Sequence, residues 1–279
     1  MAWERFQYLC RAALNKDKTE NLSDFIQHLN SKPSTKLYGN LPQDSIPFQL
    51  LKNIHALTSS EQQTTALAVY AKLDPTNLVD KPKNLRRMSV YMTWVVATYW
   101  LVVSIFKVQV FPQFLELYDV FGAPLADETQ FLMEYGPTIA LILGAILILL
   151  VILAFLLSDL VWVKHDWTKS TWYRFCPRSI RYRYQTLIDL LHYPSTNLQD
   201  EESSTETDIR KHLLDIKSSG MNLDEEIFAL FKNESAKLMR SCEMAIKTIQ
   251  IVVAIIIIYM LFYFVSGVYV PIFSLGSVV

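Results

Sequence analysis

The sequence predicts an all-α integral membrane protein, with two small cytoplasmic helical bundles and three transmembrane helices. Three observations predict this fold class. Three long stretches carry almost no charge, basic residues gather on one side of them, and the remaining segments space their apolar residues as helices do. Of the 279 residues, 51% are hydrophobic and only 19% are charged. This composition fits a chain whose apolar residues are concentrated in membrane spans.

The three apolar stretches are long enough to cross a bilayer as helices. A hydrocarbon core of about 30 Å requires about 20 helical residues, because backbone groups cannot stay unpaired in lipid. The stretches cover residues 88–110, 138–163 and 248–270, and their only charged residues are Lys107 and Asp159. Each charge lies near a span end, where long side chains usually reach the headgroups. A mid-bilayer charge would instead indicate an ion or proton path.

Lysine and arginine are distributed unequally between the two sides of the predicted spans. Basic residues precede the first span at 81–87, follow the second over 164–183 and precede the third over 232–247. The segment 111–137 has five acidic residues and no lysine or arginine, and the tail 271–279 has no basic residue either. Cytoplasmic flanks carry the excess of lysine and arginine. The N-terminus is therefore expected in the cytoplasm and the C-terminus in the periplasm.

These boundaries divide the chain into seven segments. In order, they are cytoplasmic helical domain 1 (1–87), transmembrane helix 1 (88–110), a periplasmic loop (111–137), transmembrane helix 2 (138–163), cytoplasmic helical domain 2 (164–247), transmembrane helix 3 (248–270) and a periplasmic tail (271–279).

Both cytoplasmic domains are expected to be helical bundles. Their apolar residues recur every three or four positions, which predicts amphipathic helices. The expected helices cover residues 3–14, 22–29, 48–57, 60–73, 184–191 and 209–216, with a longer one from about Leu223 onward. No proline or glycine lies between Met221 and Gly267, so the last helix is expected to continue unbroken into the third span.

The sequence shows no recognisable catalytic, cofactor-binding or metal-binding motif. Cys10, Cys176 and Cys242 form no CxxC pair, and in the cytosol they are expected to be buried, free thiols. No phosphate-binding loop, HExxH pair or GxSxG elbow occurs. The net charge of −1 gives no indication of nucleic-acid binding. The sequence therefore nominates no catalytic, cofactor-binding or metal-ligating residue, and it predicts a protein that is not an enzyme.

Two runs near the span exits have a distinctive pattern. Residues 111–132 read FPQFLELYDVFGAPLADETQFL, and residues 271–279 read PIFSLGSVV. In each run, proline is expected to end the helix and phenylalanine to anchor the exit at the interface. These runs and the alternation of helical domain and span resemble the platform proteins of type II secretion (protein F) and type IV pilus assembly. The matching outer-loop residues are Pro112, Phe114, Phe121, Gly122, Ala123, Leu125 and Thr129.

The resemblance implies a non-catalytic function and a short, divergent member of this family. Such a protein is a multi-pass platform or scaffold in the cell inner membrane. It couples a hexameric cytoplasmic ATPase to the assembly of pilin or pseudopilin subunits. The implied partners are this ATPase, pilin-like subunits, other inner-membrane machine components, membrane lipid and further copies of the chain in a homo-oligomer, with no nucleic acid. The choice between pilus and secretion system stays open.

Two other classes of protein are alternatives. A small multi-pass transporter or permease subunit would need polar or broken helices at mid-membrane, and the spans offer only Gly144 and scattered serine and threonine. A membrane-anchored enzyme would need a catalytic constellation, and none is recognisable in the sequence.

Two charged segments each allow two interpretations. The acidic segment 200–208 could bind a divalent cation, although charge runs of this kind are usually solvated loops. The basic segment 164–183 is interleaved with aromatic residues such as Trp172 and Tyr182. It could contact an acidic surface of the ATPase, or it could set the topology and contact anionic headgroups, which we favour.

Overall fold

The computed structural model is all-helical over the part of the chain that it describes, with one isolated bridge between Ser45 and His165 as its only pairing of extended backbone. The described residues are 2–15, 38, 41–57, 59–73, 83–121, 127–163, 165–195, 208–219 and 223–276. They form two compact units. Unit 1 comprises Met1–Pro82 and Leu157–Cys242, and unit 2 comprises Lys83–Leu156 and Glu243–Val279. Both segments that the sequence assigns to cytoplasmic domains thus contribute to unit 1.

Unit 1 is a set of short helices followed by the first part of a long one. Its elements are α1 (Ala2–Leu14), α3 (Ile46–Ala56), α4 (Ser60–Lys72), the 3₁₀ turns η3 (Trp167–Lys169) and η4 (Thr171–Phe175), α9 (Arg178–His192), the 3₁₀ turn η5 (Tyr193–Ser195), α10 (Asp208–Ser218) and the beginning of α11 (Leu223–Gly276). These bounds confirm the helices expected from the apolar spacing. The expected helix at 22–29 lies outside the described residues.

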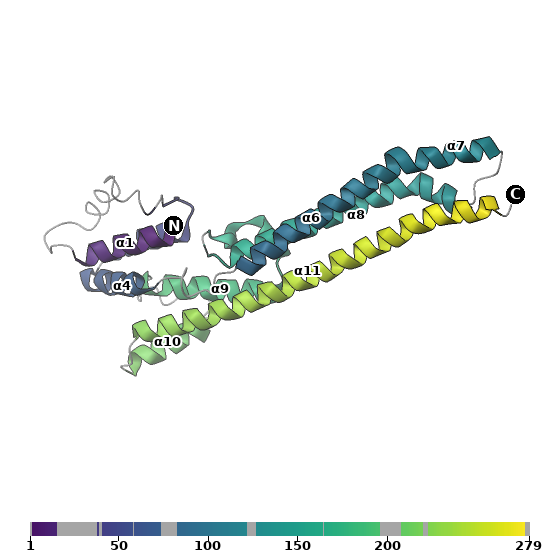
Figure 1. Cartoon of the computed structure of the whole chain (residues 1–279). Helices are drawn as coiled ribbons and strands as arrows, with labels where there is room; N and C mark the ends of the chain where they lie inside the picture. The colour runs from purple at the N-terminus through teal and green to yellow at the C-terminus, as the bar shows by residue number, and fades with distance from the viewer. Residues whose placement is uncertain are drawn as a thin grey trace. The chain divides into compact units, whose positions relative to one another are not determined.

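An aromatic cluster forms the core where α1 packs along α4 (Figure 1). Phe6 meets Trp3 and Tyr70 edge to face, at ring-centroid distances of 5.8 and 5.4 Å. All three rings are almost completely buried. Edge-to-face packing stabilises aromatic pairs beyond the effect of burying their area. The apolar stripe read from the first helix is therefore the face that builds this core.

The polar groups within this core are satisfied by backbone carbonyls. The Tyr70 hydroxyl donates to the carbonyl of Leu191, which connects α4 to α9. The Gln7 side-chain amide donates to the carbonyl of Leu73, 2.7 Å away, at the end of α4. The Trp3 indole donates to the carbonyl of Val163 at 3.1 Å. Because a buried polar group without a partner is costly, these bonds fix how α1 and α4 meet the later segment.

Unit 2 contains three long apolar helices. Its elements are α6 (Lys83–Ile105), the π-helical turn η2 (Phe106–Val110), α7 (Phe111–Phe121), most of α8 (Asp127–Leu160) and the remainder of α11. Three helical stretches are long and apolar enough to cross a membrane: Asn84–Gln113, Glu134–Leu160 and Glu225–Gly267. The expectation that the helix from Leu223 continues into the third apolar stretch is confirmed, because α11 is unbroken to Gly276.

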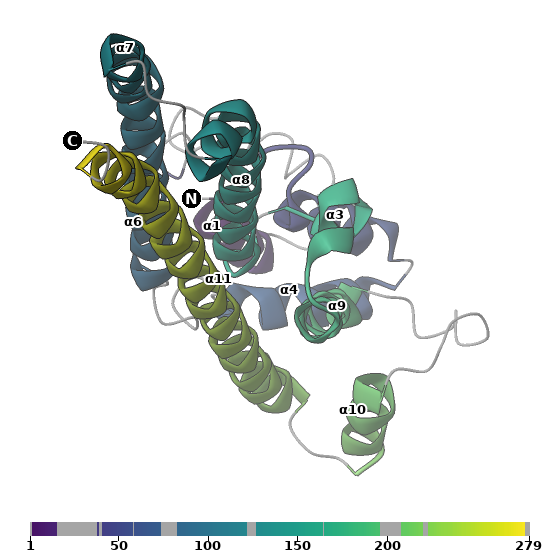
Figure 2. The same cartoon turned by 90° about the vertical axis from the view of Figure 1, so that its right-hand side faces the viewer.

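The helices of unit 2 run side by side (Figure 1, Figure 2). The Tyr99 hydroxyl of α6 donates to the carbonyl of Ala140 in α8 at 2.8 Å. Phe106 stacks on Phe264 of α11, with ring centroids 4.4 Å apart. Gly144 lies against Trp100, and a Cβ at this glycine would be 2.5 Å from the indole ring. Glycine is therefore needed at position 144 for this approach of α8 to α6.

The expectation that proline ends each helix at the Pro-x-Phe runs is wrong. Pro112 lies in α7, which follows η2 without a break, and Pro271 lies inside α11. In η2 the helix widens, and the N–H of Phe111 bonds to the carbonyl of Phe106, five residues back. A π turn of this kind changes the register of the bonds just before the proline. Ending the helix at the proline would leave several backbone carbonyls without a donor, whereas a proline inside the helix removes only one N–H donor. Continuing the helix is therefore less costly.

The segment between the first two apolar stretches is more helical than a loop. α7 covers its first part, and α8 begins at Asp127 instead of near Thr138. α8 ends at Leu160 and is followed by a turn through Val163. Residues 122–126 of the family-like run and residues 200–207 of the acidic segment lie outside the described residues.

Candidate membrane-surface site

An exposed cluster of aromatic and basic residues follows the end of α8 in unit 1. We call it the aromatic–basic surface and define it as Trp172, Phe175 and Tyr182 with Arg174 and Arg178, from η4 and α9. The three aromatic side chains are 47%, 64% and 64% exposed. The two arginines are also exposed, and neither forms a salt bridge with a described residue. The rings of Trp172 and Phe175 lie 6.0 Å apart, and exposed apolar side chains that gather in this way indicate an interaction surface.

Two other tyrosines hold this surface in place. The Tyr184 hydroxyl donates to the carbonyl of His165 at 2.7 Å and accepts from the backbone N–H of Trp167 at 3.3 Å. The Tyr173 hydroxyl donates to the carbonyl of Arg181 at 2.7 Å, and its ring packs against Tyr184 at 5.9 Å. Burial raises the pKa of both Tyr184 and Tyr173 above the usual value for a phenol. Both therefore remain neutral donors, and they add no negative charge beside the arginines.

The spacing of α9 decides which residues face outward. Arg178 and Tyr182 are four residues apart, so they share one face of the helix. Ile180, Tyr184 and Leu187 are buried on another face. In the sequence, the aromatic residues in and next to 164–183 form one interleaved set. In the structure, Tyr173 and Tyr184 bond to the backbone and support the surface, whereas Trp172, Phe175 and Tyr182 are exposed. The apolar periodicity of α9 already contained this signal for Tyr182 and Tyr184.

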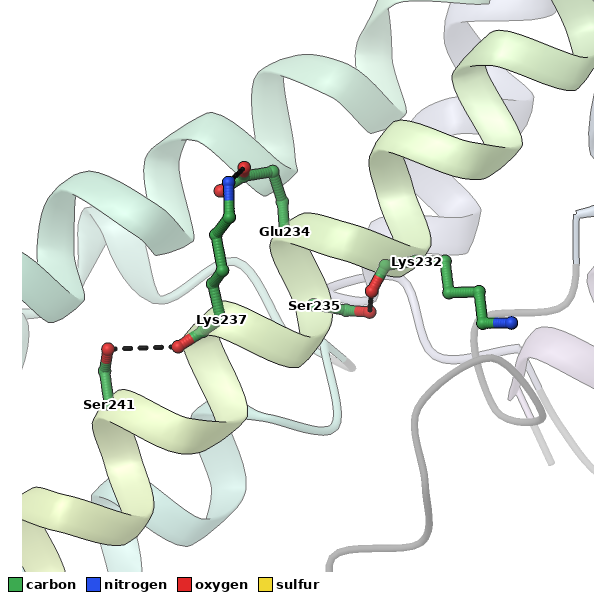
Figure 3. A network of polar contacts seen from close by, with 5 residues as sticks. All are labelled: Lys232, Glu234, Ser235, Lys237 and Ser241. Atoms are coloured by element: carbon green, nitrogen blue, oxygen red, sulfur yellow. Dashed lines mark hydrogen bonds and ion pairs between the residues drawn. The ribbon is translucent and has the colours of Figure 1, made fainter.

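The first part of α11 presents a different, polar face (Figure 3). Lys237 pairs with Glu234, three residues earlier, at 2.6 Å. The hydroxyls of Ser235 and Ser241 donate back to the carbonyls of Lys232 and Lys237 of the same helix. Serines in helices commonly satisfy their hydroxyls in this way. Ser235 is buried, and its bond to the Lys232 carbonyl satisfies its hydroxyl there, whereas the exposed Lys237 and the half-buried Ser241 keep the outer side of the helix polar.

A groove also lies in unit 1 between α4, η5 and the start of α11. Its volume is about 270 Å³. Its walls are mostly apolar, with Glu61, Gln62 and Thr65 as the polar contributions of α4. The Thr65 hydroxyl is already bonded to the carbonyl of Glu61. The groove has the character of a packing surface, because it holds no arrangement of acid, base and nucleophile.

No group of three or more histidine, cysteine, aspartate or glutamate side chains that could hold a metal occurs among the described residues. Cys10, Cys176 and Cys242 are free and buried, as expected. Burial raises the pKa of the Cys10 and Cys176 thiols, so neither is an activated nucleophile. Of the acidic segment 200–208, only the position of Asp208, the first residue of α10, is described. The proposed cation ligands there stay a prediction.

Comparisons with known proteins add no assignment: no family model, no curated protein and no solved structure matches the chain.

Proposed function

We propose that the chain is an inner-membrane platform protein of a type IV pilus or type II secretion assembly machine. In this function it couples a hexameric cytoplasmic ATPase to the assembly of pilin-like subunits, as one copy within a homo-oligomer. The family-like runs at 111–132 and 271–279 support this proposal, together with the three apolar helices. The chain needs no catalytic residue of its own for this function.

Membrane insertion is the first part of the proposal. Unit 2 exposes large apolar side chains along each of its long helices, among them Trp94, Leu141, Ile258 and Phe262, the last of which is 71% exposed. Water would make this arrangement costly, whereas lipid would favour it. The aromatic–basic surface begins at Trp172, after the end of α8 at Leu160, and matches the chemistry of the headgroup region, where tryptophan, tyrosine and arginine are enriched. The basic flanks support a cytoplasmic location for unit 1 within this proposal.

The observation that carries the coupling is the continuity of α11. The helix begins at Leu223 in unit 1 and ends at Gly276 in unit 2 without interruption. Helices kink mainly at proline, at glycine–serine pairs or at π turns, and none of these occurs in α11 between Leu223 and Val265, so we expect a displacement of its first part to be carried along this stretch. The exposed basic residues Lys232 and Arg240 lie on its first part and are available to an acidic ATPase surface.

The transporter alternative receives little support from the space between α6 and α11 in unit 2. The space between α6 and α11 is about 210 Å³ and is lined almost entirely by apolar side chains. Its two hydroxyl-bearing residues, Thr98 and Tyr99, donate to backbone carbonyls. A substrate path through this space would require free polar groups on its walls.

Two insertions between Cys242 and Glu243 test the coupling. A flexible glycine-rich insertion interrupts α11, whereas an alanine insertion of two helical turns keeps the helix and nearly restores its register. We expect the glycine variant to remain in the membrane fraction and to lose pilus assembly or pseudopilin-dependent export, and the alanine variant to keep part of it. Normal assembly with the glycine variant, or with the gene deleted, would contradict the platform function.

A charge reversal tests the orientation separately. Arg86 and Arg87 are both exposed at the beginning of α6. Arg86→Glu with Arg87→Glu removes the basic flank of the first span and should disturb insertion or invert part of the topology. Cysteine-accessibility labelling from each side of the membrane measures this. An unchanged labelling pattern at normal expression would count against the orientation.

A further inference from the structure

A cavity in unit 2 contains the one basic residue of the central apolar region. Lys107 is the only lysine or arginine between Arg87 and Lys164. Its side chain is exposed and lines a cavity of about 210 Å³ between α6, η2, α8 and α11. It forms no salt bridge with any described residue. The position of this charge in the cavity goes beyond the sequence interpretation, in which Lys107 only reaches toward the headgroups.

Two of the elements that line the cavity have irregular backbone hydrogen bonding. Lys107 belongs to the π turn η2, in which the regular hydrogen bonds of α6 are interrupted. On the opposite wall, Pro137 lies inside α8 and cannot donate to the carbonyl of Met133. Within a membrane, irregular backbone is tolerated where it is buried in protein or lines a cavity. π turns also occur frequently at functional sites.

The lining combines one cationic group with apolar walls. Phe111, Leu141 and Phe264 contribute apolar surface, and apolar area predominates in the lining. The Ser104 hydroxyl donates to the carbonyl of Trp100 at 2.8 Å, which leaves its oxygen as an acceptor. The Lys107 ammonium carries three donors and a positive charge. The cavity therefore fits a ligand with an anionic head and a hydrocarbon chain.

The size of the cavity limits how much of a ligand it holds. Sites for complete drug-sized ligands have volumes of about 300–1,000 Å³. A cavity of about 210 Å³ takes only part of such a molecule, with the remainder outside. A phospholipid satisfies this condition in a bilayer, because the rest of its chains stay among neighbouring lipids.

We propose that this cavity binds one anionic phospholipid, with the phosphate at Lys107 and the first part of an acyl chain against Phe111 and Leu141. A net-negative headgroup is favoured, because the choline of a zwitterionic lipid already neutralises its own phosphate. The inference rests on membrane insertion of unit 2 and is independent of the platform function.

Native mass spectrometry of the full chain tests the inference, with the protein purified from membranes in detergent and titrated with phosphatidylglycerol. Lys107→Met removes the charge and keeps a long side chain, Lys107→Arg keeps the charge, and Lys52→Met removes an exposed cation from α3 as a matched control. We expect about tenfold weaker retention of phosphatidylglycerol in Lys107→Met, because a charge-assisted hydrogen bond is lost. Lys107→Arg and Lys52→Met should bind as the original chain does.

Two comparisons separate the possible sources of the phosphate. Phosphatidylcholine should be retained more weakly than phosphatidylglycerol, and inorganic phosphate should not displace the lipid. Equal retention of both lipids, displacement by inorganic phosphate, or unchanged binding in Lys107→Met overturns the proposal. Recovery of the protein in the soluble fraction without detergent would overturn membrane insertion instead, so the two failures are distinguishable.

Discussion

Val163 is a β-branched residue with left-handed backbone geometry, at a φ of 47°. It lies in the turn after α8, its N–H bonds to the carbonyl of Leu160, and its own carbonyl accepts from the Trp3 indole. Its side chain is only 1% exposed. Two effects therefore compete at this position. Left-handed geometry costs an L-residue about 1–2 kcal/mol, whereas the buried side chain stabilises unit 1.

Replacing Val163 by alanine and by glycine separates these effects. Val163→Ala removes two buried methyl groups and keeps the strain, which should lower the free energy of unfolding by about 2 kcal/mol. Val163→Gly removes a further carbon and adds chain entropy, together about 1.5 kcal/mol, and it releases strain of similar size. The glycine variant should therefore be within about 0.5 kcal/mol of the alanine variant, given that these two changes nearly cancel.

Val69 provides the matched control. It is 4% exposed and lies within α4, where the backbone is helical. At Val69 no strain is released, so glycine should be less stable than alanine by about 2 kcal/mol, the sum of the lost carbon and the poorer helix propensity. The comparison between the two positions separates the effect of backbone strain on stability from the effect of lost side-chain packing.

Urea titration of the detergent-solubilised protein, followed by thiol labelling, measures these differences. Cys10, Cys176 and Cys242 are buried at 0–4% exposure and all belong to unit 1, so labelling reports the opening of that unit. A difference between glycine and alanine as large at Val163 as at Val69 would refute left-handed strain in the turn after α8.

Three further predictions concern Tyr70, Gly144 and His55. Tyr70→Phe leaves the buried Leu191 carbonyl without its donor and should destabilise unit 1 by about 1–3 kcal/mol in the same titration; no change would mean that water replaces the hydroxyl. Gly144→Ala forces its Cβ against Trp100 and should cost about 1–3 kcal/mol, measured as faster loss of monodisperse protein on heating. Trp100→Leu in the same chain should recover part of that loss. Burial lowers the pKa of His55 below its ordinary 6.5. The unfolded chain therefore binds a proton more readily, so stability should fall as the pH drops below about 6.5, and His55→Gln should reduce this slope.

Much of the helical structure could be predicted because its causes are local. The apolar stripe through Trp3, Phe6 and Leu9 needs only the spacing of neighbouring residues, and it became the buried face of α1. The absence of proline and glycine before Gly267 likewise predicted the continuous α11. The behaviour of Pro112 and Pro271 could not be predicted in the same way, because a proline can end, kink or widen a helix according to the turn before it.

Residue type alone also could not show which aromatic residues of α9 are exposed on the aromatic–basic surface and which are buried beneath it. Tyr182 and Tyr184 are two positions apart in one helix, yet the first is 64% exposed and the second is completely buried. Position 107 presents the same difficulty, because one lysine near a span end is compatible with a headgroup contact or a cavity wall. Its placement depends on α8, and in particular on where Pro137 falls opposite the π turn.

The sequence by itself determined the helical class, the three apolar helices and the side of each span on which basic residues gather. Length, periodicity and hydropathy are properties of the chain alone, so they need no knowledge of what packs against what. Only the tertiary structure decided that the N-terminal and middle segments contribute to one unit, that Val163 is left-handed and that Lys107 faces a cavity. Each of these depends on contacts between segments far apart in the chain, which local patterns do not encode.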